Sequence, residues 1–150
     1  MSKICSFAGH GDFHYGEDTY KKVINCIRKL VTEENIYEFW VGNYGAFDKL
    51  SARAVREVKK EFPQIKLCLV VPYITSELNN EKFFYENNFD EIIVPDISEN
   101  TPKKLYILYC NRYVAEHSSV LVCFVKRHGG AHETLQHASK NNVEIINIAN

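Results

Sequence analysis

Residues 119–138 read SVLVCFVKRHGGAHETLQHA and contain the clearest strand-to-helix pattern of the chain. It opens with a continuous apolar run, Ser119–Val125, which is typical of a strand buried on both faces of a parallel sheet. The run leads into Gly129 and Gly130, and apolar residues then follow at helical spacing over 131–138. A strand that passes through a glycine turn into an amphipathic helix is the repeating unit of an α/β fold.

The rest of the chain repeats this unit. Five further apolar runs, most of them β-branched, predict strands: Ile4–Ala8, Tyr37–Val41, Ile65–Val71, Glu91–Val94 and Val143–Ile148. Between the runs, helical patterns cover 17–32, 46–62 up to Pro63, and a segment that begins near Pro102; residues 76–89 have no clear pattern. We predict one doubly wound, Rossmann-like α/β domain over residues 1–150, with a mostly parallel sheet of about six strands and helices on both faces.

The seven glycines gather in three loops, each between a predicted strand and a predicted helix: Gly9, Gly11 and Gly16; Gly42 and Gly45; Gly129 and Gly130. One interpretation is turn geometry, because glycine adopts positive φ angles without strain. The other is a phosphate cradle, since glycine lets a ligand approach the backbone and a helix N-terminus favours an anion. We favour the cradle. None of the loops matches the dinucleotide or P-loop glycine motif, which argues against a Rossmann dehydrogenase or a P-loop NTPase.

Composition narrows the class of protein further. The 150 residues include 18 basic and 19 acidic side chains, a net charge of -1, which argues against a nucleic-acid partner held by backbone electrostatics. No apolar stretch approaches the roughly 18 residues of a membrane helix, so we expect no membrane partner. The five cysteines are widely spaced and include no C-x-x-C motif, which indicates buried, reduced thiols in a cytoplasmic protein.

Four short motifs occur in an order that resembles a known family. They are SFAGH at 6–10, GNYGAFD at 42–48, NRY at 111–113 and GGA at 129–131. Together they resemble the YpsA-like branch of the SLOG superfamily, which also contains the DprA/Smf and LOG proteins, and the resemblance covers residues 4–148. It implies a Rossmann-like fold that binds nucleotides or nucleotide-derived molecules. Some members hydrolyse nucleoside monophosphates, and others sense ADP-ribose-type signals.

The resemblance also implies roles for single residues. Gly129 and Gly130 would bind the phosphate, Arg112 would reach the same phosphate, and Asp48 and Asn43 would lie near the ribose or the second turn. The whole ligand-binding set that we expect is Gly9, His10, Gly42, Asn43, Gly45, Asp48, Arg112, Gly129, Gly130, Ala131, His132 and Thr134.

Glu133 is the candidate catalytic residue. Its spacing from the glycine pair is similar to that of the nucleophilic glutamate of nucleoside deoxyribosyltransferases, and a carboxylate near the sugar suits N-glycosidic chemistry. The alternative is a first-turn acid that only complements the helix dipole. The sequence departs from the family at two positions. Gly11 stands where the branch often has arginine, which removes a possible charge contact, and Gln136 stands at the glutamate of the LOG motif, which argues against LOG-type hydrolysis. We therefore expect a binding or sensing module, with an N-glycoside hydrolase or transferase as the alternative.

Two further expectations concern metals and assembly. His10 and His14, like His128 and His132, are four residues apart, but no carboxylate or cysteine completes a familiar ligand set, so we expect neither a metal nor a cofactor. We also expect a homodimer, because relatives commonly dimerise and tyrosines at 106, 109 and 113 could form an apolar patch.

Overall fold

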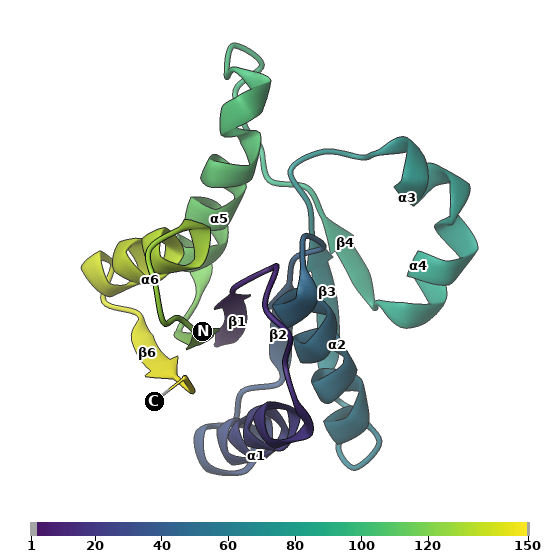
Figure 1. Cartoon of the computed structure of the whole chain (residues 1–150). Helices are drawn as coiled ribbons and strands as arrows, with labels where there is room; N and C mark the ends of the chain where they lie inside the picture. Colours follow the sequence, from purple (N-terminus) through teal and green to yellow (C-terminus); the bar gives the residue numbers. More distant parts are fainter. Residues whose placement is uncertain (1–2, 150) are drawn as a thin grey trace.

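A computed structural model describes residues 3–149 and contains one six-stranded sheet, in which all neighbouring strands are parallel (Figure 1). The strand order is β4-β3-β2-β1-β5-β6. The bounds are β1 Ile4–Gly9, β2 Glu38–Val41, β3 Lys66–Val70, β4 Glu91–Ile93, β5 Val120–Phe124 and β6 Glu144–Asn147. The predicted fold class is confirmed.

Helices cover both faces of the sheet. Their bounds are α1 Glu17–Glu34, α2 Ala46–Lys59, α3 Ser76–Asn80, α4 Lys82–Asn88, the 3-10 turn η1 Lys103–Leu105, α5 Tyr106–His117 and α6 Gly130–Lys140. In Figure 1, α1 and α2 lie on one side of the sheet, and α5 and α6 lie on the other. The segment without a clear pattern forms the short helices α3 and α4. The second predicted helix ends at Lys59 rather than at residue 62, because the chain already turns before Pro63.

Strand residues alternate between two cores, as the pleat of a strand requires. Phe7, Phe39 and Leu67 pack under α1 and α2 in the larger core. Trp40 and Val70 face the opposite way and pack with Cys110 of α5. The sheet is therefore buried on both faces, which explains why its strands read as continuous apolar runs.

Asparagine, rather than glycine, occupies the left-handed positions after two helices. Asn35 ends α1 with a φ of 56°, and Asn142 follows α6 with a φ of 62°. Asparagine tolerates this conformation better than most residues. Because asparagine occupies these two positions, no glycine is needed there, and the seven glycines all lie in or directly beside the strand-to-helix loops.

The strand order also shows where the direction of chain progression reverses, between β1 and β5. From β1 the chain adds β2, β3 and β4 on one side and then returns to place β5 on the other side of β1. Loops that leave β1 and β5 in opposite directions open a crevice at their carboxyl ends, which is where open α/β sheets bind ligands. Among the described residues, no helix combines the length and the apolar character of a membrane span.

Candidate binding site

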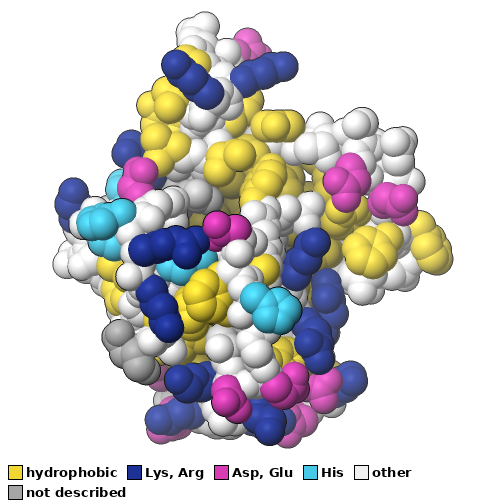
Figure 2. Space-filling model, in the orientation of Figure 1, with side chains coloured by type: hydrophobic (Ala, Val, Ile, Leu, Met, Phe, Trp, Pro, Cys, Tyr) yellow, Lys and Arg dark blue, Asp and Glu magenta, His cyan; other side chains and the backbone are white. Residues whose placement is uncertain are grey.

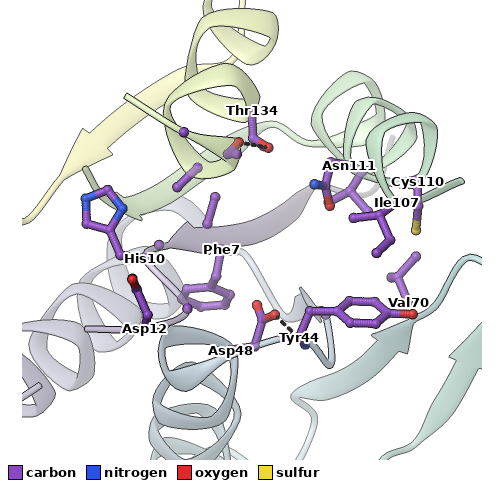
Figure 3. Close-up of a pocket in the computed structure, with 18 of the residues that line it drawn as sticks. Phe7, His10, Asp12, Tyr44, Asp48, Val70, Ile107, Cys110, Asn111 and Thr134 are labelled. Atoms are coloured by element: carbon purple, nitrogen blue, oxygen red, sulfur yellow. Dashed lines mark hydrogen bonds between the residues drawn. The ribbon is translucent and has the colours of Figure 1, made fainter. Parts of the chain in front are cut away.

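A cavity of about 330 Å³ lies at the carboxyl end of β1, between the sheet and α5 (Figure 3). All three glycine loops contribute to its wall, through Gly9 after β1, Gly42 after β2, and Gly129 with Gly130 after β5. The three loops therefore lie together at this cavity. From the expected ligand-binding set, the cavity is lined by Gly9, His10, Gly42, Asp48, Gly129, Gly130, Ala131 and Thr134.

The first two loops need glycine because they pack against other parts of the protein. A Cβ atom on Gly9 would lie 2.6 Å from Cβ of Phe47, and one on Gly45 would overlap Cα of Gly11. The Ala46 N–H group donates to the Gly11 carbonyl at 3.0 Å, which holds the two loops together. Close packing within the protein therefore explains the glycines at positions 9 and 45 without a ligand.

Gly129 and Gly130 differ, because a Cβ atom on either would meet no protein atom within 4 Å. Gly129 has a φ of +146°, which favours glycine, whereas Gly130 is the first residue of α6 and needs no such conformation. In the described chain, no side chain caps the start of α6. The first turn of α6 therefore presents backbone N–H donors and the positive end of the helix dipole to the cavity.

Arg127 is a cavity residue that the sequence analysis did not single out. Its guanidinium pairs with the carboxylate of Asp12, and both residues line the cavity beside the glycine pair. The ion pair joins the loop after β1 to the loop after β5. The sequence signal that could have identified this arginine is its position two residues before Gly129, since loop cations next to a helix N-terminus suit phosphate.

His10 joins the same two loops from the buried side. Its Nε2 accepts a hydrogen bond from the Lys126 N–H group at 3.0 Å, and its carbonyl accepts one from the Tyr15 hydroxyl at 2.7 Å. Burial, with a further contribution from Arg127, lowers the pKa of the imidazole. An accepting Nε2 requires neutral histidine, so His10 positions the loops and supplies no positive charge to a phosphate.

Asp48 places a carboxylate on the cavity wall, across from Thr134 of α6 (Figure 3). Its Oδ2 accepts a hydrogen bond from the Tyr44 N–H group at 3.1 Å. Burial raises the pKa of this carboxyl group, and backbone N–H groups of Tyr44 and Gly42 oppose the shift. An acceptor-only group here suits a hydroxyl or amine of a ligand and repels a phosphate.

The raised pKa of Asp48 predicts a pH-dependent stability difference. A carboxyl whose pKa is higher in the folded state destabilises the protein as pH rises above its unfolded pKa near 4. We expect Asp48→Asn to be more stable than wild type at pH 7 by about 1 kcal/mol, the low end of the cost of burying a polar group. Urea denaturation should show this gain disappearing below about pH 4. A variant less stable than wild type at pH 7 would contradict the assignment.

Arg112 and Glu133 lie outside the main cavity. The Arg112 guanidinium pairs with the Glu133 carboxylate at 3.0 Å, and both side chains are about half exposed. They line a smaller depression of about 250 Å³, which shares Gly130 and Thr134 with the cavity. Arg112 is thus adjacent to the predicted phosphate position but already holds a carboxylate.

Other predicted site residues also lie off the cavity wall. Asn43 contacts the Tyr85 hydroxyl at 3.4 Å, and Gly45 packs on Gly11 behind the cavity. The His132 ring lies 4.5 Å from that of His128. Within residues 3–149, no group of three or more metal-ligating side chains comes together.

The far end of the cavity is apolar, and sequence reasoning did not foresee it. It is lined by Trp40, Val70, Ile107, Cys110 and Val114, which come from β2, β3 and α5. Figure 2 shows hydrophobic side chains gathered in the hollow between α5 and the α3–α4 segment. No local pattern marks these residues as a group, because only the tertiary fold brings their three elements together.

The tyrosines of α5 do not form the continuous patch on which we based the homodimer. Tyr106 packs against Tyr73 with ring centroids 5.8 Å apart, and Tyr113 stacks on Trp40 at 6.1 Å. Of the three tyrosines, Tyr109 is 40% exposed, whereas Tyr106 and Tyr113 are half-buried. All five cysteines are free, and Cys26 is only partly buried, unlike the other four.

Comparison with known proteins identifies relatives in fold. No family model matches the chain, and no curated protein matches it. A structure of DNA processing protein A from Helicobacter pylori, described for its single-stranded DNA binding mode, has a TM-score of 0.65 at 17% identity. The match covers 95% of this chain and 63% of that chain, so this chain spans less than two thirds of that protein.

The molybdenum cofactor (Moco) carrier protein of Chlamydomonas reinhardtii is also similar in structure. Two structures of it give TM-scores of 0.60 and 0.62 at 15% and 14% identity, each over 99% of this chain and 77% of that chain. At these identities the likeness establishes the shared fold. The chain has the Rossmann-like α/β architecture of these two proteins.

Proposed function

We propose that this chain binds a phosphate-containing nucleotide or a nucleotide-derived, ADP-ribose-type molecule, as a binding or sensing module. The observation that carries the proposal is Gly130. No packing contact within the protein requires glycine at this position, because a Cβ atom on it would meet no protein atom within 4 Å. The absence of a side chain leaves the first turn of α6 open to the cavity. A bound phosphate explains that open space, because its oxygens can then reach the backbone N–H groups.

The two ends of the cavity differ in chemistry, and each suits a different part of a nucleotide: one suits the phosphate and the other the base. At the α6 end, Arg127 lines the cavity; one of its N–H groups pairs with Asp12, and the other donors of its planar fork suit phosphate oxygens. At the other end, Trp40, Val70 and Ile107 provide an apolar slot for a flat heterocycle. Asp48 between them accepts hydrogen bonds, which fits sugar hydroxyls. A volume of about 330 Å³ is at the small end for ligand pockets, which favours a compact ligand.

The structural neighbours and the resemblance support a ligand-binding role in this fold. We place the chain in the SLOG superfamily and, more narrowly, in its YpsA-like branch on the four motifs. The Moco carrier protein is named for a cofactor, so that cofactor belongs in a ligand panel. Single-stranded DNA belongs there as well because of DNA processing protein A, although the net charge of -1 favours a small molecule.

Trp40 makes this proposal directly testable. It is the only tryptophan, it is held by a hydrogen bond from Nε1 to Glu38 at 2.7 Å, and it lines the cavity. We expect AMP or ADP-ribose to change its fluorescence saturably, and calorimetry to give the same affinity. Inorganic phosphate should compete. The absence of binding to every nucleotide in the panel would overturn the proposal.

The alternative function, N-glycoside cleavage, depends on Glu133. A nucleophile needs a free carboxylate beside the sugar, but Glu133 is paired with Arg112 and lies off the main cavity wall. We therefore expect wild type to release no free base from nucleoside monophosphates above a protein-free blank. Glu133→Gln should change nucleotide affinity less than about threefold, which is about 0.7 kcal/mol. Steady base release by wild type that falls by orders of magnitude in Glu133→Gln would establish the hydrolase instead.

A further inference from the structure

One aromatic side chain on the wall of the cavity is open to solvent. Of the phenylalanine, tryptophan and tyrosine side chains there, Phe7 and Trp40 are each 5% exposed, whereas Tyr44 is 45% exposed. Phe7 stacks on Phe39, and Trp40 stacks on Tyr113. In the described chain, the Tyr44 ring pairs with no other aromatic ring and with no cation. Its face can therefore stack on a planar group of a ligand.

The Tyr44 ring extends toward α5 where the cavity opens to solvent. Figure 3 shows it reaching out from the loop after β2, with Ile107 of α5 across from it. Ile107 also lines the cavity and is 44% exposed. Burial raises the pKa of the Tyr44 hydroxyl group to about 12, and Tyr73 and Cys110 add to this rise, so the end of the ring lies near α5. An aromatic ring on one side and an aliphatic side chain on the other suit a flat heterocycle.

The backbone around Tyr44 is held in place without a ligand. The Tyr44 N–H group donates to Oδ2 of Asp48 at 3.1 Å, and the next residue, Gly45, packs closely on Gly11. The Ala46 N–H group donates to the Gly11 carbonyl at 3.0 Å. Because the loop is already ordered, the ring loses little conformational freedom when a ligand binds, and stacking then contributes more to affinity.

We infer that the Tyr44 ring stacks on the base of the bound nucleotide and makes that base a requirement for tight binding. The inference rests on the proposed function, because a phosphate at α6 fixes the end of the ligand from which the base reaches Tyr44. It narrows the ligand class, since a sugar phosphate without a base would occupy the phosphate end alone. Stacking on an aromatic side chain tolerates any base, so the selectivity is for the presence of a base rather than for its identity.

Calorimetry with AMP and ribose 5-phosphate separates the contribution of the base from that of the phosphate. We expect wild type to bind AMP at least about tenfold more tightly than ribose 5-phosphate, or about 1.4 kcal/mol, which is within the range for a base stacked on an aromatic side chain. Tyr44→Ala should weaken AMP binding at least about tenfold and leave the affinity for ribose 5-phosphate within about twofold of wild type. Tyr44→Phe should keep the wild-type preference, because the ring does the stacking.

Tyr73→Ala is the matched control. Tyr73 is 44% exposed, close to the 45% of Tyr44, but it does not line the cavity. We expect this variant to bind AMP as wild type does. Tyr44→Ala keeps the N–H group that donates to Asp48, so the loop should keep its conformation and the melting temperature should match that of wild type.

Two results would overturn the inference and leave the proposed function standing. One is a wild type that binds AMP no more tightly than ribose 5-phosphate. The other is a Tyr44→Ala variant whose affinities for the two ligands stay unchanged or fall together, which would assign Tyr44 to the shape of the loop. A wild type that binds no nucleotide contradicts the proposed function itself, and the inference with it.

Discussion

Replacing Gly130 with aspartate is expected to reduce nucleotide affinity by at least about 100-fold, or about 2.8 kcal/mol, without unfolding the protein. The new carboxylate would occupy the open space at the start of α6, where a Cβ atom meets no protein atom within 4 Å. There it would repel a phosphate and compete for the same N–H donors. An acid in the first helical turn should also raise stability by about 0.5 kcal/mol, so affinity and stability should change in opposite directions.

Gly16→Asp is the matched control for this prediction. Gly16 also lies at a helix N-terminus, that of α1, and a Cβ atom on it meets nothing within 4 Å, but it does not line the cavity. Calorimetry should give wild-type affinity for Gly16→Asp. If Gly130→Asp binds AMP or ADP-ribose as wild type does, the phosphate does not lie at α6, and the proposed orientation of the ligand is wrong.

Replacing Gly45 with alanine should cost about 3 kcal/mol of stability and lower the melting temperature by about 10 °C. The added methyl group would overlap the Cα atom of Gly11, which belongs to the backbone and cannot rotate away. Relief requires the loops after β1 and β2 to separate, which breaks the bond from the Ala46 N–H group to the Gly11 carbonyl. Differential scanning calorimetry measures the change.

Gly130→Ala serves as the comparison for Gly45→Ala. The substitution is chemically the same, but the added methyl group at residue 130 enters open space and favours the helical conformation. We expect its melting temperature to match or exceed that of wild type. If Gly45→Ala melts within about 2 °C of wild type, the close packing of the two loops is not a feature of the protein in solution.

The sequence alone was sufficient for the fold, and it identified the three glycine loops that line the cavity. Apolar runs such as Ser119–Val125 predict buried parallel strands, because successive residues of a strand point to opposite faces of the sheet. A continuous apolar run therefore requires a hydrophobic core on both faces. The strand-to-helix loops were identifiable because their glycines follow these runs directly. That Gly9, Gly42 and Gly130 then meet is a consequence of parallel strands, whose carboxyl ends share one edge.

The tertiary structure was needed to show what surrounds each of these residues. Gly45 and Gly130 are equivalent in sequence, each beside the start of a helix, yet one is packed against Gly11 and the other is open to the cavity. Likewise, the sequence favoured Arg112 for the phosphate, but the fold places Arg127 on the cavity wall and leaves Arg112 outside it. The physical reason is that packing and ion pairing depend on contacts between distant segments, whereas a sequence pattern reports only the local backbone and which face is buried.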